Sequence, residues 1–156
     1  MPEIRSILFV CTGNSCRSVM AEALLKRRLR ELGKSGISVG SAGVHAPDGV
    51  SPTDETIEVM RDLGIDVSDF RARSITAEIA KEADLILVME PLHKDEVTRM
   101  VPEAASKTYL LKEYRSSAKI GHQGTGIRDP IGRSVEDYRA CRDSIKEEIE
   151  RIVQLL

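Results

Sequence analysis

The sequence predicts an α/β fold, a four-stranded parallel sheet with helices on both faces. Two observations predict it. Short apolar runs alternate along the chain with longer segments whose apolar residues recur at helical spacing. Because each helical segment can lead from the end of one strand to the start of the next, this alternation favours parallel strands. A chain of 156 residues has the size of one domain with its own core, so we expect residues 1–156 to form a single domain.

The predicted strands are short and aliphatic. Residues 7–10 (ILFV) and 85–89 (LILVM) are apolar runs typical of buried strands. Between them, residues 37–39 are expected as a strand followed by the sequence SAG as a turn, and residues 108–111 as the fourth strand. Because ligands of parallel sheets bind at the carboxyl ends of the strands, the residues that follow the first strand are a candidate site.

Start and stop signals predict the helices. Ser51 followed by Pro52 is a strong start, and Ser134 with Asp137 has the pattern of a capping box. The expected helices are residues 18–32, 51–64, 76–83 with Thr76 as cap, 91–100, and a last helix from Ser134 onward. The last helix has an apolar stripe of Tyr138, Cys141, Ile145, Ile149, Ile152 and Leu156. Residues 114–132 predict a long loop, and loops of that length are often functional.

Composition excludes several classes of protein. With 23 Lys and Arg against 25 Asp and Glu, the chain has no excess of positive charge for nucleic acid or for an anionic membrane. No apolar run is long enough to span a bilayer, and the first residues, MPEIRS, lack the layout of a signal peptide. The three cysteines do not suit a secreted disulfide framework. We therefore expect a cytoplasmic protein with reduced thiols, and a monomer.

The stretch FVCTGNSCRS, which follows the first strand, predicts a loop that binds phosphate. A short loop between a strand and a helix can point several backbone N–H groups into one concave nest, and the helix N-terminus adds positive potential. Gly13 permits a tight backbone, and Asn14 tolerates left-handed geometry and can hydrogen-bond across the loop. The expected phosphate-binding residues are Thr12, Gly13, Asn14, Ser15, Cys16 and Ser18.

Cys11 and Arg17, at the two ends of this loop, are the candidate catalytic residues. Arg17 can hold two phosphate oxygens in a planar fork, and Cys11 would lie under the phosphorus, where positive potential favours the nucleophilic thiolate. Ser18 can donate a hydrogen bond to that thiolate. The alternative for Cys11 is an inert buried cysteine at a strand end. The loop lacks the Gly-Lys-Ser/Thr ending of a nucleotide-binding P-loop.

The pattern VCTGNSCRSxMAE resembles the signature of the low-molecular-weight protein tyrosine phosphatases, whose members include bacterial protein arginine phosphatases. Further features in family order are SAG at residues 41–43, ADLILVM, His93, LKEY at residues 111–114, and Asp129-Pro130 followed by Gly132 and Ser134. The resemblance covers nearly the whole chain. It implies a four-stranded parallel sheet, a metal-free cysteine mechanism and Asp129 as the general acid.

Asp129 also has an argument of its own. A leaving group departs from phosphorus more easily when a proton arrives with the departure, and an acid on a loop opposite the nucleophile suits this task. The alternative is that Asp129-Pro130 is an ordinary turn. Together with the other features of the sequence, the catalytic interpretation is preferred.

The sequence departs from the family pattern at two positions. Val19 follows the Arg-Ser pair where the family usually has proline, and Phe70 stands where relatives tend to carry a histidine that supports the phosphate loop. We therefore expect Asn14 and Ser41 to carry more of that support.

Three further residues, Cys16, His45 and Tyr114, have two interpretations each. Cys16 is a buried packing thiol, or, as the family implies, the partner that protects oxidised Cys11 in a disulfide. His45 and Tyr114 are candidates for the rim of the pocket; a surface histidine and a core tyrosine are the alternatives. The histidines at 45, 93 and 122 have no metal-ligand spacing, so we expect no metal and no cofactor.

The favoured function is a protein phosphatase that works through a phosphocysteine, acting on phosphorylated proteins. Phosphotyrosine enzymes of the family tend to have a bulky aliphatic residue at the position of Ser15 and aromatic residues after Asp-Pro, whereas this chain has Ile131 and Gly132 there. Arginine phosphatases resemble it more closely, so phosphoarginine is the expected substrate and phosphotyrosine the alternative. An arsenate reductase would need further redox cysteines, and a non-catalytic anion-binding module would not need Cys11, Arg17 and Asp129.

Overall fold

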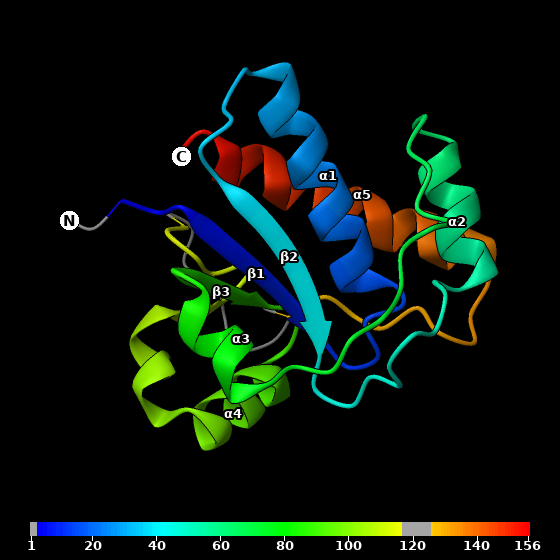
Figure 1. Ribbon diagram of the computed structural model, residues 1–156. Coiled ribbons are helices and arrows are strands. Elements are labelled where there is room, and N and C mark those ends of the chain that lie inside the picture. Colours follow the sequence, from blue (N-terminus) through cyan, green and yellow to red (C-terminus); the bar gives the residue numbers. More distant parts are fainter. Residues whose placement is uncertain (1–2, 117–125) are drawn as a thin grey trace.

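The computed structural model describes residues 3–116 and 126–156 and shows a sheet between two layers of helices (Figure 1). In this described part, four strands pair in the order β2-β1-β3-β4, and every pair is parallel. The strands are β1 (Ser6–Cys11), β2 (Ser38–Gly43), β3 (Leu85–Val88) and β4 (Thr108–Leu110). The predicted four-stranded parallel sheet is therefore confirmed.

The helices divide between the two faces of the sheet (Figure 1). They are α1 (Arg17–Glu31), α2 (Asp54–Arg61), α3 (Ala77–Glu82), α4 (Pro91–Met100), the 3₁₀ helix η1 (Pro102–Lys107) and α5 (Val135–Val153). Helices α1 and α5 cover one face, with α2 packed on α5, and α3, α4 and η1 cover the other. Among the described residues, no helix combines the length and the apolarity needed to cross a membrane.

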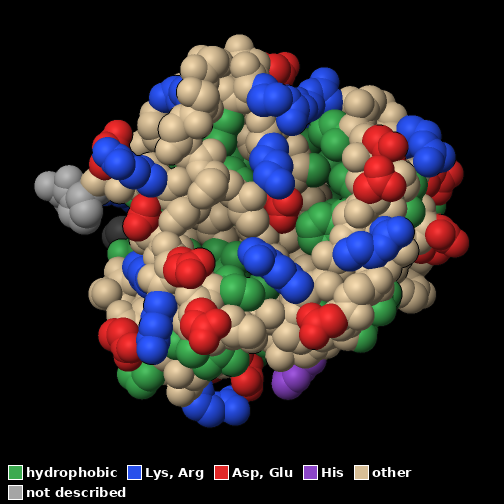
Figure 2. Space-filling view, in the orientation of Figure 1, with side chains coloured by type: hydrophobic (Ala, Val, Ile, Leu, Met, Phe, Trp, Pro, Cys, Tyr) green, Lys and Arg blue, Asp and Glu red, His purple; other side chains and the backbone are tan. Residues whose placement is uncertain are grey.

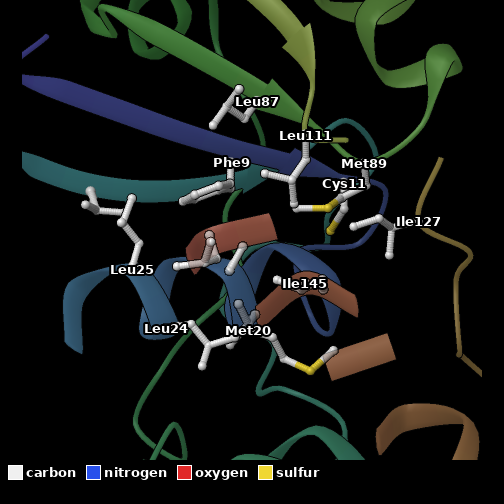
Figure 3. Packing of buried hydrophobic residues seen from close by; sticks show 14 of the residues in the cluster. Phe9, Cys11, Met20, Leu24, Leu25, Leu87, Met89, Leu111, Ile127 and Ile145 are labelled. Carbon is white, nitrogen blue, oxygen red and sulfur yellow. The ribbon is translucent and has the colours of Figure 1, made fainter. Parts of the chain in front are cut away.

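Strand β1 is buried on both faces, which explains its unbroken apolar run. Ile7 and Phe9 point to the side of α1 and α5, and Leu8 and Val10 point to the side of α3 and α4. Figure 3 shows Phe9 packed between the sheet and the two helices of the first face. On the molecular surface, acidic and basic side chains are intermingled on the face shown in Figure 2.

Two element boundaries differ from the sequence prediction. The sequence SAG is not a turn, because Ser41, Ala42 and Gly43 pair with the end of β1 and extend β2. The second helix is capped by Thr53 instead of Ser51: Thr53 Oγ1 accepts from the N–H of Thr56 (3.3 Å). The N–H of Thr53 donates to the carbonyl of Ser15 (3.2 Å). That long-range bond holds Thr53 extended, so the helix begins at Asp54, two residues after Pro52, the predicted first helical position.

The other capping signals act as predicted. Thr76 Oγ1 accepts from the N–H of Ile79 at the start of α3 (3.1 Å). Ser134 and Asp137 form the capping box that opens α5. The apolar stripe of α5 is buried from Tyr138 to Ile152, including Cys141. Of the predicted long loop, residues 117–125, which include the histidine at 122, lie outside the described residues.

The strand order creates a topological switch point at the carboxyl edge of the sheet. Strand β1 lies between β2 and β3, so the chain leaves the end of β1 toward one side and the end of β3 toward the other. Ligands of open parallel sheets bind at such a switch point. The predicted phosphate loop, which begins at the end of β1, lies there.

Candidate active site

The loop between Cys11 and Arg17 has the backbone of an anion nest. Asn14 adopts a left-handed conformation (φ 52°). Neighbouring segments hold the carbonyl groups of the loop: Val44 N–H donates to Cys11 (3.0 Å) and His45 N–H to Thr12 (3.0 Å). Within the described residues, the N–H groups of residues 12–16 donate to no protein acceptor. They are therefore available to an anion, next to the positive end of α1.

Gly43 lets the end of β2 lie against this loop. A Cβ atom at Gly43 would come within 2.5 Å of the carbonyl oxygen of Thr12 and within 3.0 Å of the N–H nitrogen of Asn14. The distance of 2.5 Å is shorter than real Cβ contacts, the distance of 3.0 Å is tight, and both atoms belong to the backbone. The glycine of SAG is thus required by close packing against the loop.

The nucleophile candidate has a defined hydrogen-bond donor. Cys11 is 2% exposed, and its Sγ lies 2.9 Å from Ser18 Oγ. The amide nitrogen of Asn14 donates one hydrogen to Ser18 Oγ (2.7 Å) and the other to Ser41 Oγ (3.0 Å). Because Ser18 accepts from Asn14, its own hydroxyl hydrogen is free to point at the sulfur. This arrangement stabilises a thiolate at Cys11.

The hydrogen bonds that hold Asn14 in place lead to two residues that sequence reasoning missed, Glu22 and Arg73. Ser41 Oγ donates to Glu22 Oε1 (2.6 Å), and Lys26 Nζ binds Glu22 Oε2 (2.6 Å). The side-chain oxygen of Asn14 accepts from the backbone N–H of Arg73 (3.0 Å). Glu22 lies one helical turn after Ser18, which is the available signal for it. The Arg73 contact is made by backbone and leaves no signal in the sequence.

Arg17 is buried and already oriented. Its side chain is 2% exposed, and Nη1 is hydrogen-bonded to Glu90 and to the carbonyl of Ile127 (2.7 Å). Its Nη2 lies 3.5 Å from Asp129 Oδ2. Both hydrogens of Nη1 are therefore used by the protein, which leaves Nε–H and Nη2–H for the oxygens of a phosphate. Glu90 was not predicted, although an acid directly after the third strand is a usable signal.

Asp129 faces the same guanidinium from the far side. Its Oδ1 accepts from the N–H of Ile131 (3.0 Å), which leaves Oδ2 as the oxygen directed at Arg17. The segment is fastened two residues earlier, where Ile127 N–H donates to the carbonyl of Met89 (2.8 Å). The carboxyl group is half-buried, with 36% of the side chain exposed. A partly exposed, anchored carboxyl group with one oxygen directed into the site suits proton transfer.

Cys16 sits behind the loop in a buried cluster of hydroxyl groups. Its Sγ lies 3.7 Å from Ser15 Oγ, 3.6 Å from Thr53 Oγ1 and 3.6 Å from the hydroxyl of Tyr138. Burial raises the pKa of Tyr138, so this hydroxyl stays protonated. Cys11 and Cys16 are both free thiols in the structure. The packing role predicted for Cys16 agrees with this position, and the protective disulfide stays a prediction.

The remaining predicted residues divide between the site and other places. Ser41 is buried beside Asn14, as expected. His45 contacts the loop through its backbone, and its side chain is exposed. Tyr114 does not line the rim: it is 5% exposed, its ring packs on Tyr109, and its carbonyl accepts from Arg151 of α5 (2.5 Å). The core alternative therefore holds for Tyr114, because the turn after β4 folds the ring back onto α5.

Cys141 and the acidic side chains provide no further reactive centre. Burial raises the pKa of the Cys141 thiol to about 12, so it stays protonated in the core. Among residues 3–116 and 126–156, no cluster of His, Cys, Asp and Glu has an arrangement that could hold a metal ion.

Known proteins of one family are similar to this chain over most of its length. The family model described as low molecular weight phosphotyrosine protein phosphatase matches residues 6–156. A protein-arginine-phosphatase of Geobacillus stearothermophilus is 39% identical over 150 residues, covering 96% of this chain and 95% of the relative. The low molecular weight protein-tyrosine-phosphatase Etp of Escherichia coli K12 is 40% identical over 119 residues, or 76% of each chain. The solved structure of a YwlE mutant from Bacillus subtilis has a TM-score of 0.88 at 32% identity, covering 97% of both chains.

Proposed function

Because the chain belongs to the low molecular weight phosphotyrosine protein phosphatase family, we propose that it hydrolyses phosphorylated amino-acid side chains of proteins through a cysteinyl phosphate. The observation that carries the proposal is the placement of Cys11 Sγ, with its donor Ser18 at 2.9 Å, at the start of a loop closed by the preoriented Arg17. Turnover of an aryl phosphate, inhibited by vanadate, tests this proposal. Absence of turnover in folded protein contradicts it.

The first step forms the bond between sulfur and phosphorus. The thiolate of Cys11 attacks in line, the bond from phosphorus to the leaving group breaks, and Asp129 Oδ2 gives its proton to the departing atom. Nε and Nη2 of Arg17 and the N–H groups of the loop bind the equatorial oxygens, where negative charge is held in the transition state.

The second step regenerates the enzyme. Asp129, now a carboxylate, takes a proton from the water that attacks phosphorus. The bond between sulfur and phosphorus breaks, and Cys11 leaves as a thiolate that Ser18 stabilises by its hydrogen bond. Inorganic phosphate is the product.

For the substrate, we propose phosphoarginine, with phosphotyrosine as the alternative. Relatives of both kinds have similar identities to this chain, so the support comes from the site. Ser15 is half-buried at the apex of the loop, and its Oγ has the Cys16 sulfur as a neighbour at 3.7 Å. If the hydroxyl hydrogen points to that sulfur, the oxygen lone pairs can accept an N–H from a guanidinium. Ile131, which is 57% exposed beside Asp129, supplies no aromatic surface for a phenyl ring.

Exchange of Ser15 tests the choice of substrate. Ser15→Ile removes the acceptor and fills the space of a planar guanidinium, so phosphoarginine hydrolysis should fall roughly ten- to a hundredfold. Phosphotyrosine hydrolysis should hold or rise, because an aliphatic side chain packs on the ring. Ser15→Thr keeps the hydroxyl and should preserve the phosphoarginine activity.

The assay measures kcat/KM of the three proteins on phosphoarginine and phosphotyrosine peptides. A wild type that strongly prefers phosphotyrosine, or a ratio that Ser15→Ile leaves unchanged, makes the protein a tyrosine phosphatase. Arsenate reduction is disfavoured, because Cys141, the third cysteine, is buried and its pKa is raised. A cytoplasmic location and a monomeric state remain part of this proposal.

A further inference from the structure

His93 is a buried ionisable side chain to which the mechanism above gives no task. It lies in the first turn of α4 and is 0% exposed. Both ring nitrogens are hydrogen-bonded: Nδ1 to the backbone N–H of Glu90 (3.0 Å) and Nε2 to Thr12 Oγ1 (2.8 Å). One imidazole thus joins the phosphate loop to the segment that pairs with Arg17.

The partners of His93 decide its tautomer. The backbone N–H of Glu90 is a donor only, so Nδ1 must be the acceptor and carries no hydrogen. The ring hydrogen is therefore on Nε2, which donates to the oxygen of Thr12. An imidazolium would place an N–H of Nδ1 against the N–H of Glu90 and lose that bond.

Charges around the ring favour the same neutral form. Burial, followed by the charge of the Arg17 guanidinium, lowers the pKa of His93 to about 4. Asp129 acts in the opposite direction and is outweighed. Among the described residues, Arg17 of α1 and Asp129 of the acid-bearing segment are the charged groups that act on the ring, while Glu90, after β3, contacts it through its backbone N–H.

The bridge spans a place where the sheet gives no further support. The last backbone bond between the two segments runs from Met89 N–H to the carbonyl of Val10 (3.1 Å). Beyond it, β1 continues into Cys11 and Thr12, and β3 continues into Glu90. The His93 ring links Thr12, the neighbour of the nucleophile, to the backbone of Glu90, whose carboxylate orients Arg17.

We propose that His93, as the neutral tautomer with its hydrogen on Nε2, is a positioning residue that holds the phosphate loop in register with the Glu90–Arg17 pair. The inference rests on the proposed phosphatase function. It predicts that the ring contacts with Thr12 and Glu90 affect catalysis together, as one unit. It also predicts that this effect on catalysis can be measured apart from any effect on the stability of α4.

Two substitutions separate the contacts. In His93→Asn the side-chain oxygen can still accept from Glu90 N–H, but nothing reaches Thr12. Thr12→Val removes the acceptor at nearly constant volume. We expect each to lower kcat on an aryl phosphate roughly three- to tenfold, and the double variant to fall no further than either single one. Asp95→Asn, on the exposed side of α4, is the matched control and should leave kcat unchanged.

The readouts distinguish positioning from mere stabilisation. Variants that melt earlier but keep wild-type kcat well below their melting temperature overturn the proposal, as do additive losses in the double variant. In the wild type, ¹⁵N NMR of the imidazole should show hydrogen on Nε2 from pH 5 to 8; a ring with hydrogen on Nδ1, or an imidazolium, overturns it as well.

The test also separates this inference from the proposed function. If the wild type turns over no phosphorylated substrate, the proposed function fails, and orthovanadate binding then reports on the loop. His93→Asn and Thr12→Val should weaken vanadate affinity by a similar factor, and unchanged affinity in both contradicts the positioning role.

Discussion

Replacement of Arg17 by lysine should remove most of the activity although the charge is kept. The guanidinium is 2% exposed; its Nη1 is hydrogen-bonded to Glu90 and to the carbonyl of Ile127, and its Nη2 lies 3.5 Å from Asp129 Oδ2. A lysine ammonium places three hydrogens at one point and cannot serve these acceptors and two phosphate oxygens at once. The variant therefore loses one phosphate contact and leaves the Ile127 carbonyl without its donor.

The size of the loss follows from the bonds involved. Hydrogen bonds to charged groups contribute about 1.5–3 kcal/mol each, and one contact to the phosphate is lost in the transition state. The expected decrease in kcat/KM is thus roughly 10- to 150-fold. The assay is steady-state kinetics on p-nitrophenyl phosphate, together with vanadate affinity and a thermal melt to show that the variant is folded. Arg30→Lys, on the exposed side of α1, is the control. A folded Arg17→Lys enzyme with activity within about threefold of wild type refutes the reasoning.

Further substitutions probe the other parts of the site. Cys11→Ser should abolish turnover and keep phosphate binding measurable by calorimetry; residual hydrolysis would remove Cys11 from its role. Asp129→Asn should slow alkyl and tyrosyl phosphates far more than p-nitrophenyl phosphate, because nitrophenolate leaves without a proton; equal slowing would make Asp129 structural. Gly43→Ala should lower both the melting temperature and kcat, because its Cβ would lie 2.5 Å from the Thr12 carbonyl; a silent substitution would contradict that packing. Because the pKa of His93 is lowered from 6.5 to about 4, the unfolded chain binds a proton at His93 in this pH range and the native state does not. The free energy of unfolding should therefore fall as the pH drops below 6.5, by about 2–3 kcal/mol at pH 4.5. Urea melts at pH 7 and 4.5 measure this, and His93→Asn should lose that part of the pH dependence.

Local signals in the sequence determined the fold class and the reacting groups. Residues 7–10 form a buried strand because each side chain meets apolar neighbours on its own face, and an unbroken aliphatic run reports that directly. The capping box of Ser134 and Asp137 is likewise a contact between near neighbours. Cys11, at the end of β1, and Arg17 and Ser18, at the start of α1, are joined by one short loop, so their spacing was enough to predict that they meet.

Tertiary structure alone decided the partners of those groups. Arg17 is oriented by Glu90 and Ile127, and Asn14 by the backbone of Arg73, all from distant parts of the chain. The sequence left Tyr114 open between the rim and the core, because nothing local tells whether a ring after a strand turns toward the edge of the sheet or back into the core.

The same limit applies to the boundaries of two elements. Strand β2 extends through the SAG residues because β1 offers backbone partners as far as Cys11. Thr53 caps α2 because its N–H donates to the carbonyl of Ser15. Hydrophobic periodicity reports which residues are buried, but it carries no information on the order of strands in a sheet. That order, β2-β1-β3-β4, brings the ends of β1 and β3 together and so places Glu90 and His93 beside the phosphate loop.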